Sequence, residues 1–206
     1  MKVVGFSGYS GSGKTTLIEK LIGHLKHAGA RVSVVKHAHH DFDIDHPGKD
    51  SYRHREAGAY EIVIASDRRL AKIREYDAPA VPTLASMLAE LSACDWVLVE
   101  GFKAAALPKI EVWRAANGKP VQYPSDPRIV AVATDEPASL PEPTALPVLA
   151  LSDVAAVAEF LWSDAERYEY VATAARAAAE AAAEAADAHA GRGAGASGRR
   201  GPSAGR

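Results

Sequence analysis

The chain has too few cysteines to cross-link it and no apolar run long enough to anchor it in a membrane. Cys94 is the single cysteine among 206 residues, so an internal disulfide and a cysteine-rich zinc site are both excluded, and a reducing compartment is favoured. No run of about 18 apolar residues occurs, and the amino-terminus has no basic segment followed by an apolar stretch. We therefore expect a cytoplasmic protein that is not associated with a membrane.

Strong net charge of either sign is also missing. The formal net charge is −2 and the sequence pI is about 6.4, which gives no general electrostatic attraction to nucleic acid or to anionic lipid. Neither is an expected partner.

What the chain does have is a series of short apolar runs separated by helical patterns. Several runs are apolar on both faces, as buried parallel strands are. Helical spacing is clearest at 14–28, 82–93 and 152–162, the last with Ser152 or Asp153 as its N-cap. This alternation predicts an α/β fold with a mostly parallel sheet flanked by helices. The predicted strands are 2–6, 31–36, 61–66, 95–100, 128–134 and 146–151.

Two further runs, 68–75 and 108–115, alternate polar with apolar residues. Such alternation is typical of strands with one solvated face, and it predicts antiparallel additions at a sheet edge.

The composition changes near the carboxyl end. Thirteen of the twenty residues from 171 to 190 are alanine, and residues 191–206 contain six glycines and four arginines. We predict a main domain over 1–165, an alanine-rich helical extension over 166–190 and a disordered tail over 191–206.

A glycine-rich stretch, GYSGSGKTT at residues 8–16, joins the first predicted strand to the first predicted helix. We call it the glycine loop. Its spacing matches the phosphate-binding pattern G-x-x-x-x-G-K-[ST], in the strand-loop-helix context that the pattern requires. Loop amides would hold the β-phosphate, Lys14 would reach the β and γ oxygens, and the Thr15 hydroxyl would ligate Mg²⁺. The predicted nucleotide contacts are Gly8, Ser10, Gly11, Ser12, Gly13, Lys14, Thr15 and Thr16.

A second candidate is the histidine-rich segment 36–59, which is long for a connection between strand and helix. Five of the eight histidines lie between His37 and His54. We weigh three interpretations: a transition-metal site, a solvated loop, and a switch segment that approaches Mg²⁺ and the γ-phosphate. In the third, Asp45 contacts Mg²⁺ or its water, Lys49 and Arg53 meet an anion, and Asp50-Ser51 caps the helix that follows.

A third candidate is Glu100, which ends the apolar run 95–100. An acidic residue at the end of a buried strand is the Walker B pattern, which places a carboxylate beside Mg²⁺. Glu100 would act as a metal ligand, through water, or as a base.

Base recognition is harder to predict, because the Asn-Lys-x-Asp pattern is absent. Asp135 follows a late strand and is either an acceptor for the N1 and N2 protons of guanine or a turn residue.

Together, GYSGSGKTTLIEKLI, VKHAHHDFDIDHPGKDSYRHREAGA and LVEGFK resemble the MobB family of molybdopterin-guanine dinucleotide biosynthesis adapters, over roughly residues 2–162. The resemblance implies a P-loop NTPase of the Rossmann-like three-layer type that binds GTP with Mg²⁺, hydrolyses it slowly and is usually dimeric. It also implies a partner, the guanylyltransferase that joins GMP to molybdopterin; molybdopterin itself is a further candidate ligand. By matching positions, Gly13, Lys14, Thr15 and Thr16 take the phosphate and Mg²⁺ roles and Glu100 the Walker B role. Together with Asp45 from the switch interpretation, this makes Lys14, Glu100 and Asp45 the candidate catalytic residues, and Thr15, Asp45 and Glu100 the candidate metal contacts.

Two alternatives stay open at this point. One is a kinase acting on a small metabolite, in which Lys49 and Arg53 hold the acceptor and Asp45 or Asp50 is the base. The other is a metal-delivery protein that carries its cargo in the histidine-rich segment.

Overall fold

The computed structural model describes residues 1–38, 42–77 and 82–171, which form two compact units. Unit 1 comprises Met1–Val35 and the chain from Thr83 onward, and unit 2 comprises Lys36–Pro82. From residue 172 on, the predicted alanine-rich extension and tail lie outside the described residues.

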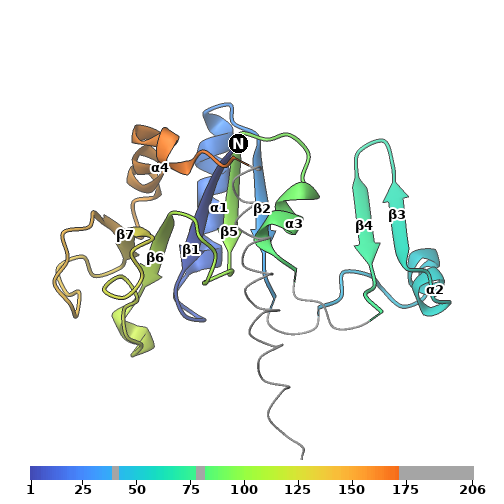
Figure 1. Cartoon of the computed structure of the whole chain (residues 1–206), viewed down its shortest axis with the longest axis horizontal. Helices are drawn as coiled ribbons and strands as arrows, with labels where there is room; N and C mark the ends of the chain where they lie inside the picture. Colours follow the sequence, from blue (N-terminus) through green and yellow to red (C-terminus); the bar gives the residue numbers. More distant parts are fainter. Residues whose placement is uncertain (39–41, 78–81, 172–206) are drawn as a thin grey trace, which may run out of the picture. The chain divides into compact units, whose positions relative to one another are not determined.

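Unit 1 is built on a six-stranded sheet in the order β2-β5-β1-β6-β7-β8 (Figure 1). The pairs β5·β1, β1·β6, β6·β7 and β7·β8 are all parallel, which confirms the mostly parallel sheet that the sequence predicts. Parallel pairing brings the carboxyl ends of β1, β5, β6 and β7 to one edge of the sheet. The strands are β1 (Lys2–Ser7), β2 (Val32–Lys36), β5 (Trp96–Glu100), β6 (Lys109–Trp113), β7 (Ile129–Thr134) and β8 (Val148–Ala150).

Helices cover both faces of this sheet. On one face, α1 (Lys14–His27) and α4 (Val154–Ser163) bury leucines, isoleucine and valines against alternate residues of β1 and β5, such as Phe6 and Leu98. On the other face, Leu88 of α3 (Leu84–Ala89) packs against Val97 and Val99. The predicted three-layer α/β sandwich is therefore confirmed. Asp153 caps α4 as predicted, because its Oδ1 accepts the Ala156 amide at 3.0 Å.

The interpretation of run 108–115 as an antiparallel edge strand is wrong. Its core, β6, lies in the interior of the sheet, parallel to both β1 and β7, and all five of its residues are buried. The polar residues that suggested a solvated face are satisfied internally. Lys109 Nζ pairs with Asp126 Oδ2 at 2.8 Å, and the Glu111 carboxylate accepts amide hydrogen bonds from Gln122 and Tyr123. These contacts fix the segment after β6 onto the sheet.

The last described residues of unit 1 pack against the first strand. Tyr168, at the end of the short 3₁₀ helix η2 (Ala165–Tyr168), is 1% exposed and stacks obliquely on Trp96, with ring centroids 5.5 Å apart. Burial raises the pKa of Tyr168 to about 12. Lys2 Nζ pairs with Glu169 Oε1 at 3.1 Å, and the Tyr170 amide donates to the Met1 carbonyl.

Unit 2 consists of the short helix α2 (Asp50–Glu56) followed by an antiparallel pair, β3 (Glu61–Ala65) and β4 (Leu70–Arg74). Run 68–75 is antiparallel as predicted, but it forms a separate two-stranded sheet with run 61–66 instead of adding to an edge of the main sheet. The apolar run 61–66 is therefore not a buried parallel strand: Val63 is 59% and Ile64 43% exposed.

Candidate functional site

The glycine loop begins where β1 ends and closes at the first residue of α1. Gly8 has a φ of +133°, and a Cβ built there would lie 2.3 Å from the Val112 carbonyl oxygen of β6. Gly13, with a φ of +96°, occupies the N-cap position of α1. Only glycine accepts both the conformation and the close approach, so the loop can turn its amides inward at the sheet edge.

Lys14 and Thr15, the first two residues of α1, already make the contacts of a polar site. Lys14 Nζ donates to the Gly8 carbonyl at 2.9 Å and to the Tyr9 carbonyl at 2.7 Å. The Thr15 hydroxyl donates to Glu100 Oε1 at 2.9 Å. The structure thus brings Glu100, the last residue of β5, next to the start of α1, which follows the neighbouring strand β1.

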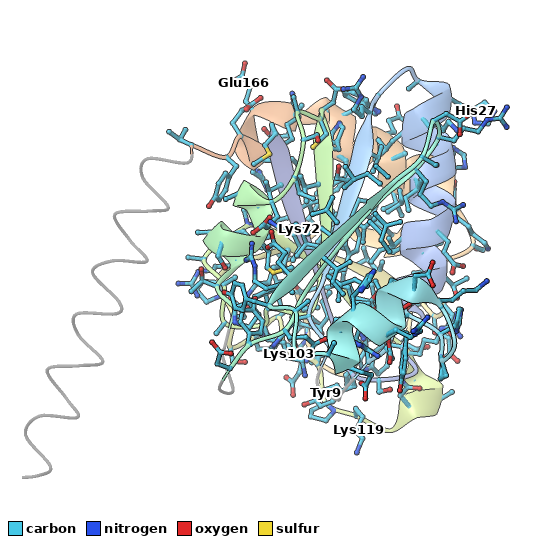
Figure 2. The ribbon with its side chains drawn as sticks, turned by 90° about the vertical axis from the view of Figure 1, so that its right-hand side faces the viewer. Tyr9, His27, Lys72, Lys103, Lys119 and Glu166 are labelled. Carbon is cyan, nitrogen blue, oxygen red and sulfur yellow. The ribbon has the colours of Figure 1, made fainter. Side chains whose placement is uncertain are left out.

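The segment after β5 turns sharply next to the loop. Gly101 and Phe102 both have left-handed backbones, with φ of +96° and +47°, and Phe102 is the only non-glycine residue with positive φ in the described ranges. The turn carries Lys103 over the Tyr9 ring, 5.2 Å from its centroid. Figure 2 shows Tyr9 and Lys103 at the same end of the molecule as Lys119, opposite His27 and Glu166.

The other predicted loop residues have distinct surroundings. Ser12 is 1% exposed, and its Oγ is buried without a hydrogen bond to any described residue. Ser10 is exposed, and its carbonyl accepts from Asn117 Nδ2 at 3.4 Å. Gly11 would bring a Cβ 3.7 Å from Asn117 Oδ1, and Thr16 is exposed.

Arg114 and Asn117 are site neighbours that the sequence analysis missed. Arg114 follows β6 and Asn117 ends the 3₁₀ helix η1 (Ala115–Asn117). The Arg114 guanidinium lies against Gly13, and its Nε is 3.6 Å from Oδ2 of Asp135, which follows β7. The missing signal was the central position of β6, because a residue that follows a central parallel strand lies at the same edge as the glycine loop.

In unit 2, the predicted switch residues form a local network of their own. Asp45 Oδ1 accepts from the Ser51 hydroxyl at 2.8 Å, while its Oδ2 is buried without a hydrogen bond to the described residues. Arg55 binds Asp43 through two hydrogen bonds of 3.1 and 2.8 Å, and these hydrogen bonds lower the pKa of Asp43. The prediction that Asp50-Ser51 caps α2 is wrong, because the N-cap is Lys49 and the Ser51 hydroxyl binds Asp45 instead.

The transition-metal interpretation of segment 36–59 receives no support from the residues that can be described. His39, His40 and Asp41 lie outside them. Among the described residues, no group of three or more His, Cys, Asp or Glu side chains could hold a metal ion. Over the same residues, no helix combines the length and the apolar character needed to cross a bilayer.

Comparison with known proteins assigns the chain to a family. Residues 3–135 match the model of the family described as molybdopterin guanine dinucleotide synthesis protein B. The chain is 44% identical over 135 residues to the molybdopterin-guanine dinucleotide biosynthesis adapter protein of Haemophilus influenzae, covering 66% of this chain and 75% of that protein. It is 39% identical over 163 residues to the Escherichia coli protein of the same name, covering 77% and 90%.

Two solved structures share the fold. The crystal structure of a MobB homolog from Bacillus stearothermophilus matches with a TM-score of 0.60 and 28% identity, over 80% of this chain and 97% of that one. A crystal structure of molybdopterin-guanine biosynthesis protein B matches with a TM-score of 0.60 and 31% identity, over 78% and 98%. With the family model covering well over half of its length, the chain belongs to the molybdopterin guanine dinucleotide synthesis protein B (MobB) family.

Proposed function

We propose that the chain is a GTP-binding adapter in the synthesis of molybdopterin-guanine dinucleotide, and that it hydrolyses GTP slowly. The observation that carries the proposal is the contact between Thr15 and Glu100 beside the glycine loop. A hydroxyl and a carboxylate at this place are the two protein oxygens that a phosphate-binding loop offers to a nucleotide-bound Mg²⁺. Family membership supplies the biosynthetic context.

In this proposal, the residues of the glycine loop bind the phosphates of the nucleotide. The inward-facing amides and the start of α1 hold phosphate oxygens. Lys14 transfers its hydrogen bonds from the loop carbonyls to the β and γ oxygens, and Gly13 allows the close approach. The buried Ser12 hydroxyl, which lacks a hydrogen bond within the described residues, is a further donor in the same loop.

Thr15 and Glu100 fit Mg²⁺, because both present oxygen and lie 2.9 Å apart, a separation that a bound cation would replace with two metal-oxygen contacts. Bound there, Mg²⁺ would neutralise phosphate charge. Glu100 would hold the cation or its water. A carboxylate that holds the cation does not serve as a general base, which supports slow hydrolysis.

Asp45 and Lys49 remain proposed contacts, the first for water on Mg²⁺ and the second for phosphate. The buried Asp45 Oδ2 supports a polar ligand for this side chain, and Lys49 is exposed in front of α2.

A homodimer is supported by the apolar surface of unit 2. A two-stranded hairpin is marginally stable by itself, and here large apolar side chains stay uncovered: Phe42 is 75%, Ile44 64%, Val63 59% and Leu70 68% exposed. Contiguous exposed apolar surface marks interaction sites. We propose that a second copy of this chain covers it and that the guanylyltransferase that attaches GMP to molybdopterin is the further partner.

The test is calorimetric titration with GTP and, separately, ATP, each with Mg²⁺. We expect GTP to bind about tenfold more tightly, or 1.4 kcal/mol. Lys14→Ala should abolish tight triphosphate binding without unfolding the protein, whereas Lys20→Ala, on the exposed side of the same helix, should bind as the wild type does. Equal or tighter ATP binding would count against the adapter and for a kinase.

Adapter function requires a second assay. Purified guanylyltransferase should form molybdopterin-guanine dinucleotide faster when the chain is added, and the Lys14→Ala variant should fail to stimulate it. If the chain binds GTP but does not stimulate the guanylyltransferase, the proposed nucleotide site stands and the proposed adapter role is contradicted.

A further inference from the structure

Arg114 and Asp135 form a charged pair at the edge of the sheet where the glycine loop opens. Both are the first residues after parallel strands, β6 and β7, and Arg114 Nε lies 3.6 Å from Asp135 Oδ2. Their side chains are 39% and 40% exposed. They are therefore joined to each other and still accessible from solvent.

The pair is also attached to the glycine loop. A Cβ built on Gly13 would lie 3.2 Å from Arg114 Nη2, 3.3 Å from Cζ and 3.4 Å from Nε. Three nearly equal distances mean that the guanidinium rests face-on against Gly13. Asn117, three residues on, donates to the Ser10 carbonyl, so the segment after β6 is fixed to the loop at two places.

The charge of the pair bears on what it could recognise. A guanidinium and a carboxylate sum to zero, so the pair offers little attraction to a polyphosphate. A neutral ring that carries acceptors on one edge and donors on the next suits it better. Guanine is such a ring: O6 and N7 accept, while N1–H and the N2 amino group donate.

We propose that Arg114 and Asp135 read the guanine base together, the guanidinium donating to O6 and the carboxylate accepting from N1 and N2. This rests on the proposed binding of GTP at the glycine loop, and it adds Arg114 to a base site for which the sequence pointed only to Asp135. Adenine is rejected at both positions, because its N6 amino group would face the guanidinium and its unprotonated N1 would face the carboxylate. The face-on contact with Gly13 keeps the reading pair in a fixed position relative to the phosphate loop.

The test separates base reading from phosphate binding by using five probes with Mg²⁺: GTP, ITP, XTP, ATP and inorganic tripolyphosphate. Asp135→Asn should lower the affinity for GTP about tenfold or more. It should raise the affinity for XTP, since the Asn amide can donate to the O2 carbonyl that xanthine has in place of the amino group. Arg114→Gln should lower the affinities for GTP, ITP and XTP by similar factors, because all three bases keep O6. Neither variant should change tripolyphosphate affinity.

Matched controls come from the same two segments. Lys119→Gln removes a positive charge from the exposed part of the segment after β6, and Glu136→Gln removes a carboxylate next to Asp135; both should bind all five probes as the wild type does. Thermal melting of each variant establishes that it is folded. If Arg114→Gln were unfolded, Arg114→Lys, which keeps the charge but loses the planar fork, should show the same pattern with a smaller loss.

The test distinguishes failure of this base-recognition inference from failure of the proposed GTP binding. Loss of tripolyphosphate binding in Arg114→Gln, equal to the loss of GTP binding, would make Arg114 a phosphate ligand and overturn the inference. An unchanged ratio of GTP to XTP affinity in Asp135→Asn would overturn it as well. A wild-type protein that binds neither GTP nor tripolyphosphate would remove the nucleotide site itself.

Discussion

The Thr15 hydroxyl donates a hydrogen bond of 2.9 Å to Glu100 Oε1 across 85 residues of sequence. Thr15 is the second residue of the helix that follows β1. Glu100 ends β5, which pairs with β1 in parallel register, so that Phe6 lies opposite Glu100. The register of two strands thus sets the distance between the two oxygens, and a change in either residue should affect the same site.

Glu100→Gln should lower the rate of GTP hydrolysis by more than it lowers GTP affinity, because the amide keeps the shape and loses the negative charge that Mg²⁺ and its water require. We expect about a tenfold fall in rate. Phosphate release under saturating GTP gives the rate, and calorimetry gives the affinity. Glu166→Gln, at the end of unit 1 opposite Tyr9 and Lys103 (Figure 2), is the control, and equal rates for wild type and both variants would make Glu100 a bystander.

Asp126→Asn should destabilise the protein by about 3 kcal/mol, since it leaves the charge of Lys109, which is 2% exposed, without its partner. Denaturant unfolding measures the loss. The exposed pair of Arg167 with Asp164 is the comparison, with side chains 43% and 47% exposed, and Asp164→Asn should cost less than about 1 kcal/mol. Similar losses at the two sites would mean that burial does not set the strength of the Lys109 pair.

Glu111 should make stability depend on pH. Burial raises the pKa of its carboxyl, in spite of the amide hydrogen bonds from Gln122 and Tyr123, so between the unfolded and the folded pKa the folded chain binds more protons than the unfolded chain does. The stability from this group is fully present below the unfolded pKa of about 4.3 and is lost as pH rises through the folded pKa. The difference in unfolding free energy between wild type and Glu111→Gln should therefore shift in favour of the variant from pH 4 upward; a constant difference would contradict it.

Tyr168→Ala should cost about 3 kcal/mol of unfolding free energy, because it removes a fully buried ring that packs on Trp96. Tyr168→Phe is the matched variant. The Tyr168 hydroxyl is buried and makes no hydrogen bond to the described residues, so its removal should change stability by no more than about 0.5 kcal/mol. Thermal or denaturant unfolding tests both, and a large loss in the Phe variant would reveal a partner for the hydroxyl.

The sequence predicted the layers of the fold and the proximity of Thr15 to Glu100 because those depend on local patterns. The glycine loop has a spacing that few other structures require, and Glu100 ends an apolar strand that pairs with β1. Alternation misled where polar side chains were satisfied inside the protein. Lys109 and Glu111 imitate the solvated face of an edge strand, yet their partners are Asp126 and two amides beyond β6, which no local pattern reveals.

The same error concealed Arg114. With β6 assigned to an edge, the residue after it had no reason to be near the loop; with β6 beside β1, it lies against Gly13. The prediction for the apolar run 61–66 was wrong for the opposite reason, because Val63 and Ile64 are exposed in a hairpin. An apolar pattern does not distinguish a buried core from an exposed interaction surface.

The two hydrogen bonds from Lys14 to the Gly8 and Tyr9 carbonyls have a consequence for the selectivity of the proposed site. A phosphate that reaches the loop meets an ammonium group that is already engaged, so binding is an exchange of acceptors and not a simple capture. Ligands with many oxygens compete well in such an exchange, whereas a single orthophosphate replaces the carbonyls poorly. Cellular orthophosphate would then seldom occupy the loop.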